Sequence, residues 1–105
     1  MADLSQLFQL GQQVQGRLTE MQTELAERSV TGSAGGGMVK VTADGRGQIR
    51  TIEIDPAAAA DGDVEMLEDL VLAAVSDAQR KADELYRDEL KKLTGGLPLP
   101  FQFPL

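Results

Sequence analysis

Residues 38–54 of the chain, MVKVTADGRGQIRTIEI, alternate apolar and polar side chains on both sides of a short glycine-rich stretch. An alternation with a period of two is typical of β-strands that bury one face. We therefore expect a β-hairpin with strands at Met38–Ala43 and Ile49–Ile54. In the connection, Asp44–Gly47, the pair Gly45-Arg46 fits a two-residue turn with glycine at its first central position.

This turn sets the predicted register of the hairpin, with Val39 opposite Ile52 and Val41 opposite Arg50. One face is then mainly apolar, and we expect it to form the core: Val39, Val41, Ala43, Ile52 and Ile54. Arg50 falls on the same face, so we expect it near an edge or with its charge extended to solvent. The other face is mixed and leaves room for a partner: Met38, Lys40, Thr42, Ile49, Thr51 and Glu53.

The β region extends upstream of the hairpin, because Val30–Asp55 as a whole is rich in β-branched residues and glycine. A three-stranded sheet is therefore expected. Within it, the Ser33–Gly37 stretch SAGGG has the glycine content of a phosphate-binding loop. It lacks both the Lys-Ser/Thr ending and the G-x-G-x-x-G spacing of such loops. We interpret its glycines as serving a turn, a bulge or a close backbone approach.

The N-terminal segment is predicted to form one long helix, which Asp3 or Ser5 can cap. Its apolar positions alternate in spacings of three and four residues over about three heptads: Leu4, Leu7, Gly11, Val14, Leu18, Met21 and Leu25. Gly11 is the one weak position, because it has no side chain to contribute to the apolar stripe. We favour packing of this stripe on the domain's own sheet or second helix, because so few heptads are marginal for an autonomous coiled coil. A coiled-coil-like contact with a partner is the alternative.

A second long helix is expected after the sheet. Asp55-Pro56 ends the last strand, and Ala57–Ala60 can form a single helical turn. The long helix then begins at an N-cap, Asp63, and stops at Gly95-Gly96. Its apolar stripe is broad at first and thins later: Val64, Leu67, Leu70, Val71, Ala74, Val75, Ala78, Ala82, Leu85, Leu90 and Leu93.

These elements divide the chain into a single α+β domain, residues 1–96, and a tail, residues 97–105. The tail sequence LPLPFQFPL cannot be helical, so we expect it to be extended or laid over an apolar groove. A helix from Val64 to Leu93 would be roughly 45 Å long at ~1.5 Å per residue. A compact domain of this length is only about 30–35 Å across. The helix should therefore project beyond the sheet with part of its apolar stripe uncovered, which predicts a homodimer.

Composition excludes most enzyme classes. The 105 residues include no cysteine, no histidine and no tryptophan, and the net charge is −7. Thiol and imidazole catalysis and the usual zinc ligands are thereby removed. The acidic residues Asp61, Asp63 and Glu65 lack the spacing of a calcium loop. No stretch is long and apolar enough to span a membrane, and no secretory signal is present. We expect a cytoplasmic, non-catalytic protein without metal or cofactor.

Basic residues gather in the second half of the last helix: Arg80, Lys81, Arg87, Lys91 and Lys92. The first interpretation is structural, with complementarity to the helix dipole and pairing with acids one turn away. The second is a phosphate-contact surface at a projecting helix end. We favour the structural interpretation from the residues alone, because acidic residues interleave with the basic ones and no aromatic run offers a stacking platform.

The chain resembles the YbaB/EbfC family of bacterial nucleoid-associated proteins over nearly its whole length. The segments that carry the resemblance are Val30–Thr42, Ile52–Pro56 and Glu65–Val71, continuing to Ala73-Ala74 and Asp77-Ala78. The resemblance implies an α+β fold in which helices flank a three-stranded antiparallel sheet, and a tweezer-shaped homodimer. It also implies binding of double-stranded DNA with little sequence preference and a place in the nucleoid. By position, the implied DNA contacts are Arg17, Arg80, Arg87, Lys91 and Lys92.

The alternative function is a protein-interaction module of the replication or recombination machinery without direct DNA binding. It is motivated by the acidic net charge and by the two phenylalanines of the tail, Phe101 and Phe103. Such a module would present the tail or the mixed sheet face to a protein partner.

Overall fold

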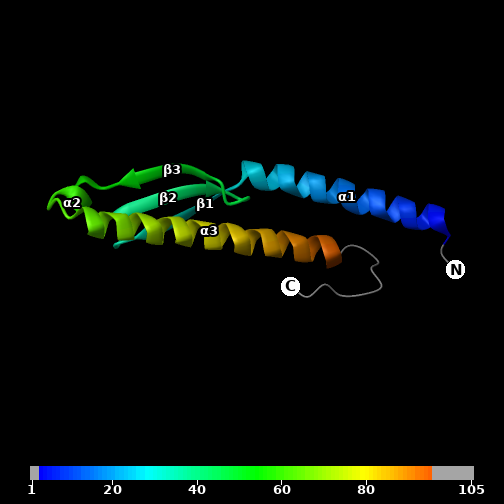
Figure 1. The fold of residues 1–105 in the computed structure, drawn as a ribbon. Coiled ribbons are helices and arrows are strands. Elements are labelled where there is room, and N and C mark those ends of the chain that lie inside the picture. The colour runs from blue at the N-terminus through cyan, green and yellow to red at the C-terminus, as the bar shows by residue number, and fades with distance from the viewer. Residues whose placement is uncertain (1–2, 96–105) are drawn as a thin grey trace.

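The computed structural model describes residues 3–95, which form three helices and three strands. In chain order these are α1 (Leu4–Glu27), β1 (Ser29–Ala34), β2 (Val39–Asp44), β3 (Ile49–Ile54), α2 (Pro56–Ala59) and α3 (Val64–Gly95), as Figure 1 shows. The strands form one antiparallel sheet in the order β1-β2-β3. The predicted α+β order of long helix, sheet and long helix is confirmed. The tail, residues 97–105, and the domain boundary before it lie outside the described residues.

Aspartate side chains begin the two long helices. Asp3 Oδ1 accepts a hydrogen bond from the backbone N–H of Gln6 at 2.9 Å, and Asp63 Oδ1 accepts one from Met66 at 3.0 Å. Each bond satisfies a donor that the first helical turn leaves unpaired. The predicted cap at Asp63 is confirmed, and of the two candidates for α1 the cap is Asp3. The single turn expected after Asp55-Pro56 is present as α2.

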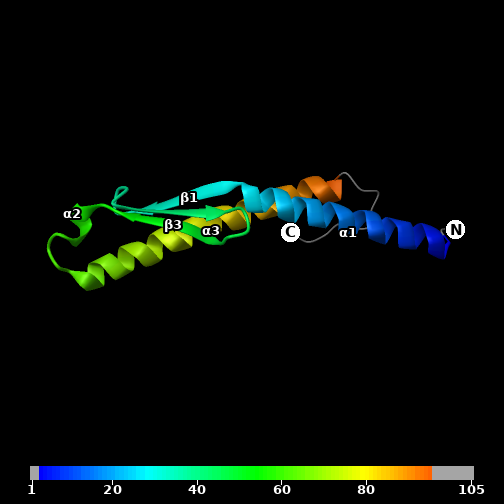
Figure 2. The same cartoon turned by 90° about the horizontal axis from the view of Figure 1, so that it is seen from above.

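The molecule is strongly elongated. Its extents are 70 × 23 × 17 Å and its radius of gyration is 19.5 Å, against ~13 Å for a compact domain of this length. Figures 1 and 2 show that α1 and α3 extend beyond the same end of the sheet, with α1 reaching farther. The predicted projection of the second long helix, α3, beyond the sheet is confirmed.

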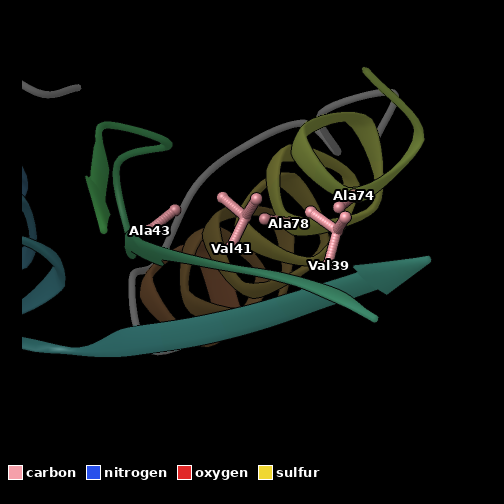
Figure 3. Packing of buried hydrophobic residues seen from close by; sticks show 5 residues of the cluster. All are labelled: Val39, Val41, Ala43, Ala74 and Ala78. Atoms are coloured by element: carbon pink, nitrogen blue, oxygen red, sulfur yellow. The ribbon is translucent and has the colours of Figure 1, made fainter. Parts of the chain in front are cut away.

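The core lies where α3 crosses β1 and β2. Its fully buried side chains are small or β-branched, as Figure 3 shows: Val39, Val41, Ala43, Ala74 and Ala78. At Gly32 of β1, a β-carbon would overlap the backbone nitrogen of Ala78 and the carbonyl oxygen of Ala74, and it would lie 2.8 Å from Ala78 Cα. Glycine in the strand and alanine in the helix therefore set the short distance between the two layers. Gly35, Gly36 and Gly37, which follow, all have positive φ and form the β1–β2 turn.

The predicted hairpin register is wrong by two residues. Val39 pairs with Ile54 and Val41 pairs with Ile52, and a bulge at Thr42/Ala43 then sets Ala43 opposite Ile49. A bulge adds one residue to one strand and so reverses the alternation beyond it. Ile49 consequently packs against the core, although the prediction placed it on the mixed face.

The connection between β2 and β3 also differs from the predicted two-residue turn. Asp44 N–H donates to the carbonyl of Gln48 at 2.9 Å, which leaves a three-residue loop, Gly45–Gly47. Gly47 has φ 87°, a left-handed conformation that suits the last position of such a loop. Arg50 lies in the bulged part of β3, and its guanidinium extends to Asp44 at 3.0 Å while remaining half exposed. The expected edge position of Arg50 is thus explained by an ion pair.

The core face is covered unevenly. Val39, Val41 and Ala43 are fully buried as predicted, but Ile52 and Ile54 are 47% and 41% exposed. These two isoleucines share the core face through their pairing with β2. They are uncovered because α3 lies over the other two strands (Figure 2).

The expectation that the whole α1 stripe packs inside the domain is wrong. Only Met21 and Leu25, in the last turns of α1, are buried. Leu4 is 84% exposed, Leu7 56% and the neighbouring Phe8 71%. The first turns of α1 project past the sheet and past the end of α3 (Figure 1), so no partner for them exists within residues 3–95.

Candidate nucleic-acid interface

The basic residues implied by the resemblance lie on the two projecting helices. Arg17 is on α1, whereas Arg80, Arg87, Lys91 and Lys92 are in the second half of α3, and all five are exposed. The structure therefore gathers four of them on one helical segment and leaves Arg17 on a separate arm.

Carboxylates neutralise much of the α3 cluster. Three of its members have partners one helical turn away, with N–O distances of 2.6–3.3 Å: Arg80 with Asp77 and Glu84, Arg87 with Asp83, and Lys92 with Glu89. The pairs expected from the structural interpretation are present at these positions. Exposed ion pairs are worth only about 0.2–1 kcal/mol each, so a phosphate can replace the carboxylate at modest cost.

Asp77 and Lys81 also fasten α3 to the outer edge of β1. Asp77 Oδ2 accepts a hydrogen bond from Ser33 N–H at 3.1 Å, and Lys81 Nζ donates to the carbonyl oxygen of Thr31 at 2.8 Å. The hydrogen bond from Arg80 and then the one from Ser33 hold the pKa of Asp77 below its usual value. The ionised Asp77 therefore occupies a backbone donor that would otherwise be open along this edge.

Three cationic side chains within residues 3–95 have no carboxylate partner: Arg17, Lys40 and Arg46. All three are exposed. Sequence reasoning missed Arg46, because an arginine in a glycine-rich turn carries no signal that separates it from an ordinary solvated turn residue. Only the three-dimensional position of the hairpin tip, against α1 and α3, sets it apart.

The hairpin tip that carries Arg46 is held by a buried carboxylate. Asp44 is 2% exposed, and its Oδ1 accepts from the backbone N–H groups of Arg46 at 2.9 Å and Gln48 at 3.0 Å. Burial acts to raise the pKa of Asp44, but the bonds from Gln48 and Arg46 and the charge of Arg50 together hold it below its usual value. The tip is also docked on the end of α1, since Gly45 N–H donates to the carbonyl of Leu25 at 2.8 Å.

A cleft of about 500 Å³ with mixed polar and apolar walls lies between the end of α1, the hairpin tip and α3. Its lining includes Gln22 from α1, Arg46 from the hairpin, and Gln79, Asp83 and Tyr86 from α3. The carboxylate of Asp83 is paired with Arg87 at 3.1 Å. The cleft thus joins neutral hydrogen-bonding groups with the basic half of α3.

An apolar groove of about 460 Å³ lies near the opposite end of the molecule, between β3 and the first half of α3. We call it the β3–α3 groove; its apolar lining is Ile54, Val64, Leu67, Val71, Leu72 and Val75. Leu72 is 65% exposed and Val64 is 63% exposed. Exposed aliphatic side chains in a contiguous patch mark an interaction surface.

Within residues 3–95, no cluster of acidic side chains is arranged to hold a metal ion, and none of the helices is long and apolar enough to cross a membrane.

Comparison with known proteins agrees with this arrangement. Residues 1–97 match the YbaB/EbfC DNA-binding family. The chain belongs to this family. It is 42% identical to a nucleoid-associated protein of Gemmatimonas aurantiaca over 97% of this chain and 98% of that protein. It is 46% identical to a nucleoid-associated protein of Thermoanaerobacter sp. over 96% and 91% of the two chains.

The fold of the family member also matches a solved structure. The crystal structure of an uncharacterized protein from Helicobacter pylori superimposes with a TM-score of 0.78 at 25% identity, and the match covers 91% of this chain and all of the other. The resemblance drawn from the sequence and the α+β fold it implied are therefore confirmed. Membership of a DNA-binding family also supports a non-catalytic protein.

Proposed function

We propose that this YbaB/EbfC family protein is a nucleoid-associated homodimer that binds double-stranded DNA with little sequence preference. The observation that carries the proposal is its membership of a DNA-binding family, together with relatives that are themselves nucleoid-associated proteins. Lysine and arginine side chains of the projecting helices contact phosphates, and the release of counterions from the duplex drives binding.

The acidic net charge does not oppose this function, because the charges are separated along α3. Residues 56–79 contain six acidic and no basic side chains, whereas residues 80–95 contain five basic and four acidic ones. Asp69 and Arg87 are about 27 Å apart along a helix that rises ~1.5 Å per residue. Screening at physiological ionic strength acts over about 8 Å. A duplex at the basic half of α3 is therefore largely insulated from the acidic start of the helix.

The proposed phosphate contacts are Arg17 on α1 and Arg80, Arg87, Lys91 and Lys92 on α3. Arg17 needs no rearrangement, because it has no carboxylate partner in the described part of the chain. Arg80, Arg87 and Lys92 exchange a carboxylate for a phosphate. Since their ion pairs are exposed, this exchange costs little, and the duplex supplies more negative charge than a single carboxylate.

The proposed dimer forms through the β3–α3 groove. A second copy suits this groove because the uncovered isoleucines of β3, Ile52 and Ile54, continue its apolar surface onto the sheet face. β3 is also an edge strand of the sheet, and at the other edge Asp77 and Lys81 occupy groups of β1. The basic half of α3 lies beyond this surface, so both copies keep their phosphate contacts exposed.

DNA binding is tested by fluorescence anisotropy of a random duplex across a salt series. If each subunit supplies about three contacts, the log–log salt slope is near −5 for a dimer. The triple variant Arg87→Ala, Lys91→Ala, Lys92→Ala should bind much more weakly and with a shallower slope. Unchanged binding would refute the assignment of these residues as DNA contacts. No binding of the unaltered protein at low salt would refute the function and direct attention to a protein partner.

The dimer is tested by light scattering of two matched variants. Leu72→Glu places a charge in the β3–α3 groove, and Leu7→Glu places one at a comparably exposed position of α1. The unaltered protein and Leu7→Glu should scatter as dimers, while Leu72→Glu should scatter as a monomer at micromolar concentration. A dimer that survives Leu72→Glu and dissociates with Leu7→Glu would move the interface to α1.

A further inference from the structure

Arg46 at the β2–β3 hairpin tip has the properties of a preorganised anion contact. Its backbone N–H is fixed by the buried Asp44 carboxylate at 2.9 Å, and the adjacent Gly45 is buried against Leu25. Its guanidinium is exposed and has no carboxylate partner among residues 3–95. A phosphate that binds this cation displaces no existing ion pair.

The cleft beside Arg46 supplies further hydrogen-bonding groups. Gln22 and Tyr86 line it from α1 and α3, and Gln79 donates from its side-chain amide to the carbonyl of Gly47 at 3.5 Å. The one acidic group of the lining, Asp83, is paired with Arg87 at 3.1 Å. The volume of the cleft, about 500 Å³, is within the range of ligand sites, roughly 300–1,000 Å³.

The chemistry of this cleft fits a phosphodiester. Guanidinium groups bind phosphate oxygens through paired N–H donors, and amide and phenol groups bind the remaining phosphate and sugar oxygens. The cleft lies between the base of α1 and the base of the projecting half of α3. A duplex that contacts both arms would therefore pass close to the hairpin tip.

We propose that Arg46 is a phosphate-contacting residue and that the cleft of Gln22, Arg46, Gln79 and Tyr86 receives the backbone of double-stranded DNA. This inference rests on the proposed function and adds to it a third element, the β2–β3 hairpin, beside the two helices. The hairpin contact is independent of the carboxylate exchange that the α3 residues require.

The test compares Arg46→Ala with Lys40→Ala in the intact protein. Lys40 is the matched control, because it is a second exposed and unpaired cation of the same hairpin, on the sheet face away from α3. Affinity for a random 20-base-pair duplex should fall about tenfold or more for Arg46→Ala. The salt slope should become shallower by about 0.9 for each phosphate that is no longer neutralised, or about 2 for a dimer. Lys40→Ala should match the unaltered protein.

Two further variants separate charge from shape. Arg46→Lys should keep the salt slope while losing part of the affinity, because ammonium replaces the charge without the paired donors. Tyr86→Phe should weaken binding a few-fold without changing the slope. Circular dichroism should give the same unfolding midpoint for the Arg46 and Lys40 variants as for the unaltered protein, since neither residue makes an ion pair in the fold.

The outcomes distinguish this inference from the proposed function. If the unaltered protein binds DNA and Arg46→Ala binds equally well, the hairpin contact is refuted and DNA binding through the helices stands. If Arg46→Ala and Lys40→Ala lower the affinity for the duplex equally, the specific contact is refuted, and the hairpin acts only through its overall positive charge. If the unaltered protein does not bind the duplex at low salt, both are refuted.

Discussion

α1 and α3 carry similar apolar stripes, but only one of them is packed. α3 buries Ala74, Ala78 and Ala82 and also packs Leu67, Leu70, Val71 and Val75 against the core. α1 buries only Met21 and Leu25, and its Leu4 and Leu7 are exposed. The difference comes from what faces each stripe. The alanines of α3 meet a strand with glycine at the contact, so the two backbones approach closely. The leucines at the start of α1 are exposed and have no such packing partner among residues 3–95. A heptad pattern therefore shows that a helix has an apolar face, but not where that face packs.

Gly32→Ala should disrupt the packing of α3 on the sheet and cause the largest loss of stability. Its β-carbon would overlap the backbone of Ala78 and Ala74, which cannot move without shifting α3. Overpacking of this kind costs about 3 kcal/mol, a large share of the stability of a small domain. Thermal and urea unfolding measure the loss.

The matched change on α1 is Gly16→Ala, where a β-carbon would have no neighbour within 4 Å. Alanine is favoured over glycine within a helix, so this variant should gain about 0.5–1 kcal/mol. Equal losses at Gly16 and Gly32 would show that α1 is packed as tightly as α3.

Asp44→Asn should cause the next largest loss of stability, and the size of this loss should depend on pH. The folded protein lowers the pKa of Asp44 below 3.8. The ionised carboxylate therefore stabilises the fold above that pH, and the contribution is lost as the pH falls through the folded pKa. The unfolding midpoint of Asp44→Asn should lie below that of the unaltered protein at pH 5–7, and the gap should close as the pH falls below about 4.

Asp3→Asn serves as the control on α1. Asn is also a good N-cap, and this end of the helix is exposed, so the unfolding midpoint should hardly change. A gap for Asp44→Asn that stayed constant down to pH 2 would contradict a role for its charge.

Glu89→Gln should loosen the tie between the two arms. Arg28, at the end of α1, pairs with Glu89 of α3 at 3.0 Å. The loss in global stability should be about 0.5 kcal/mol, as for other partly exposed pairs. Amide hydrogen exchange in the last turns of α1 should nevertheless become faster. Unchanged exchange there would show that the docking of Gly45 on Leu25 alone holds α1 in place.

Leu7→Ala should have the smallest effect, because Leu7 is 56% exposed. We expect a change within about 0.5 kcal/mol, as for surface positions. A loss of several kcal/mol that depends on protein concentration would instead reveal that the α1 stripe packs against a partner, which is the coiled-coil alternative.

Local signals account for most of what the sequence predicts. The caps at Asp3 and Asp63, the order of elements and the buried Val39, Val41 and Ala43 all follow from neighbours in the chain. The hairpin register does not, because a buried Asp44 carboxylate selects the three-residue loop and a bulge shifts the pairing. Carboxylate burial is a tertiary property that periodicity does not report.

The candidate site likewise contains residues that the sequence identifies and one that only the structure singles out. Helical spacing identifies the cations of α3 and also their acidic partners one turn away. Arg46 could not be singled out, since its importance depends on the hairpin tip meeting both α1 and α3. Which cations lack a carboxylate is likewise decided by side-chain geometry rather than by counting charges.

The hydrogen bonds from Asp77 and Lys81 to the rim of β1 have a consequence for growth of the sheet. These two bonds occupy part of the edge of β1, which favours extension of the sheet past β3, its other edge strand. Once two copies meet there, the combined sheet ends at an occupied β1 on either side. In the proposed dimer, growth of the sheet would then terminate at two chains, which would protect a protein held at high local density from polymerising into fibres.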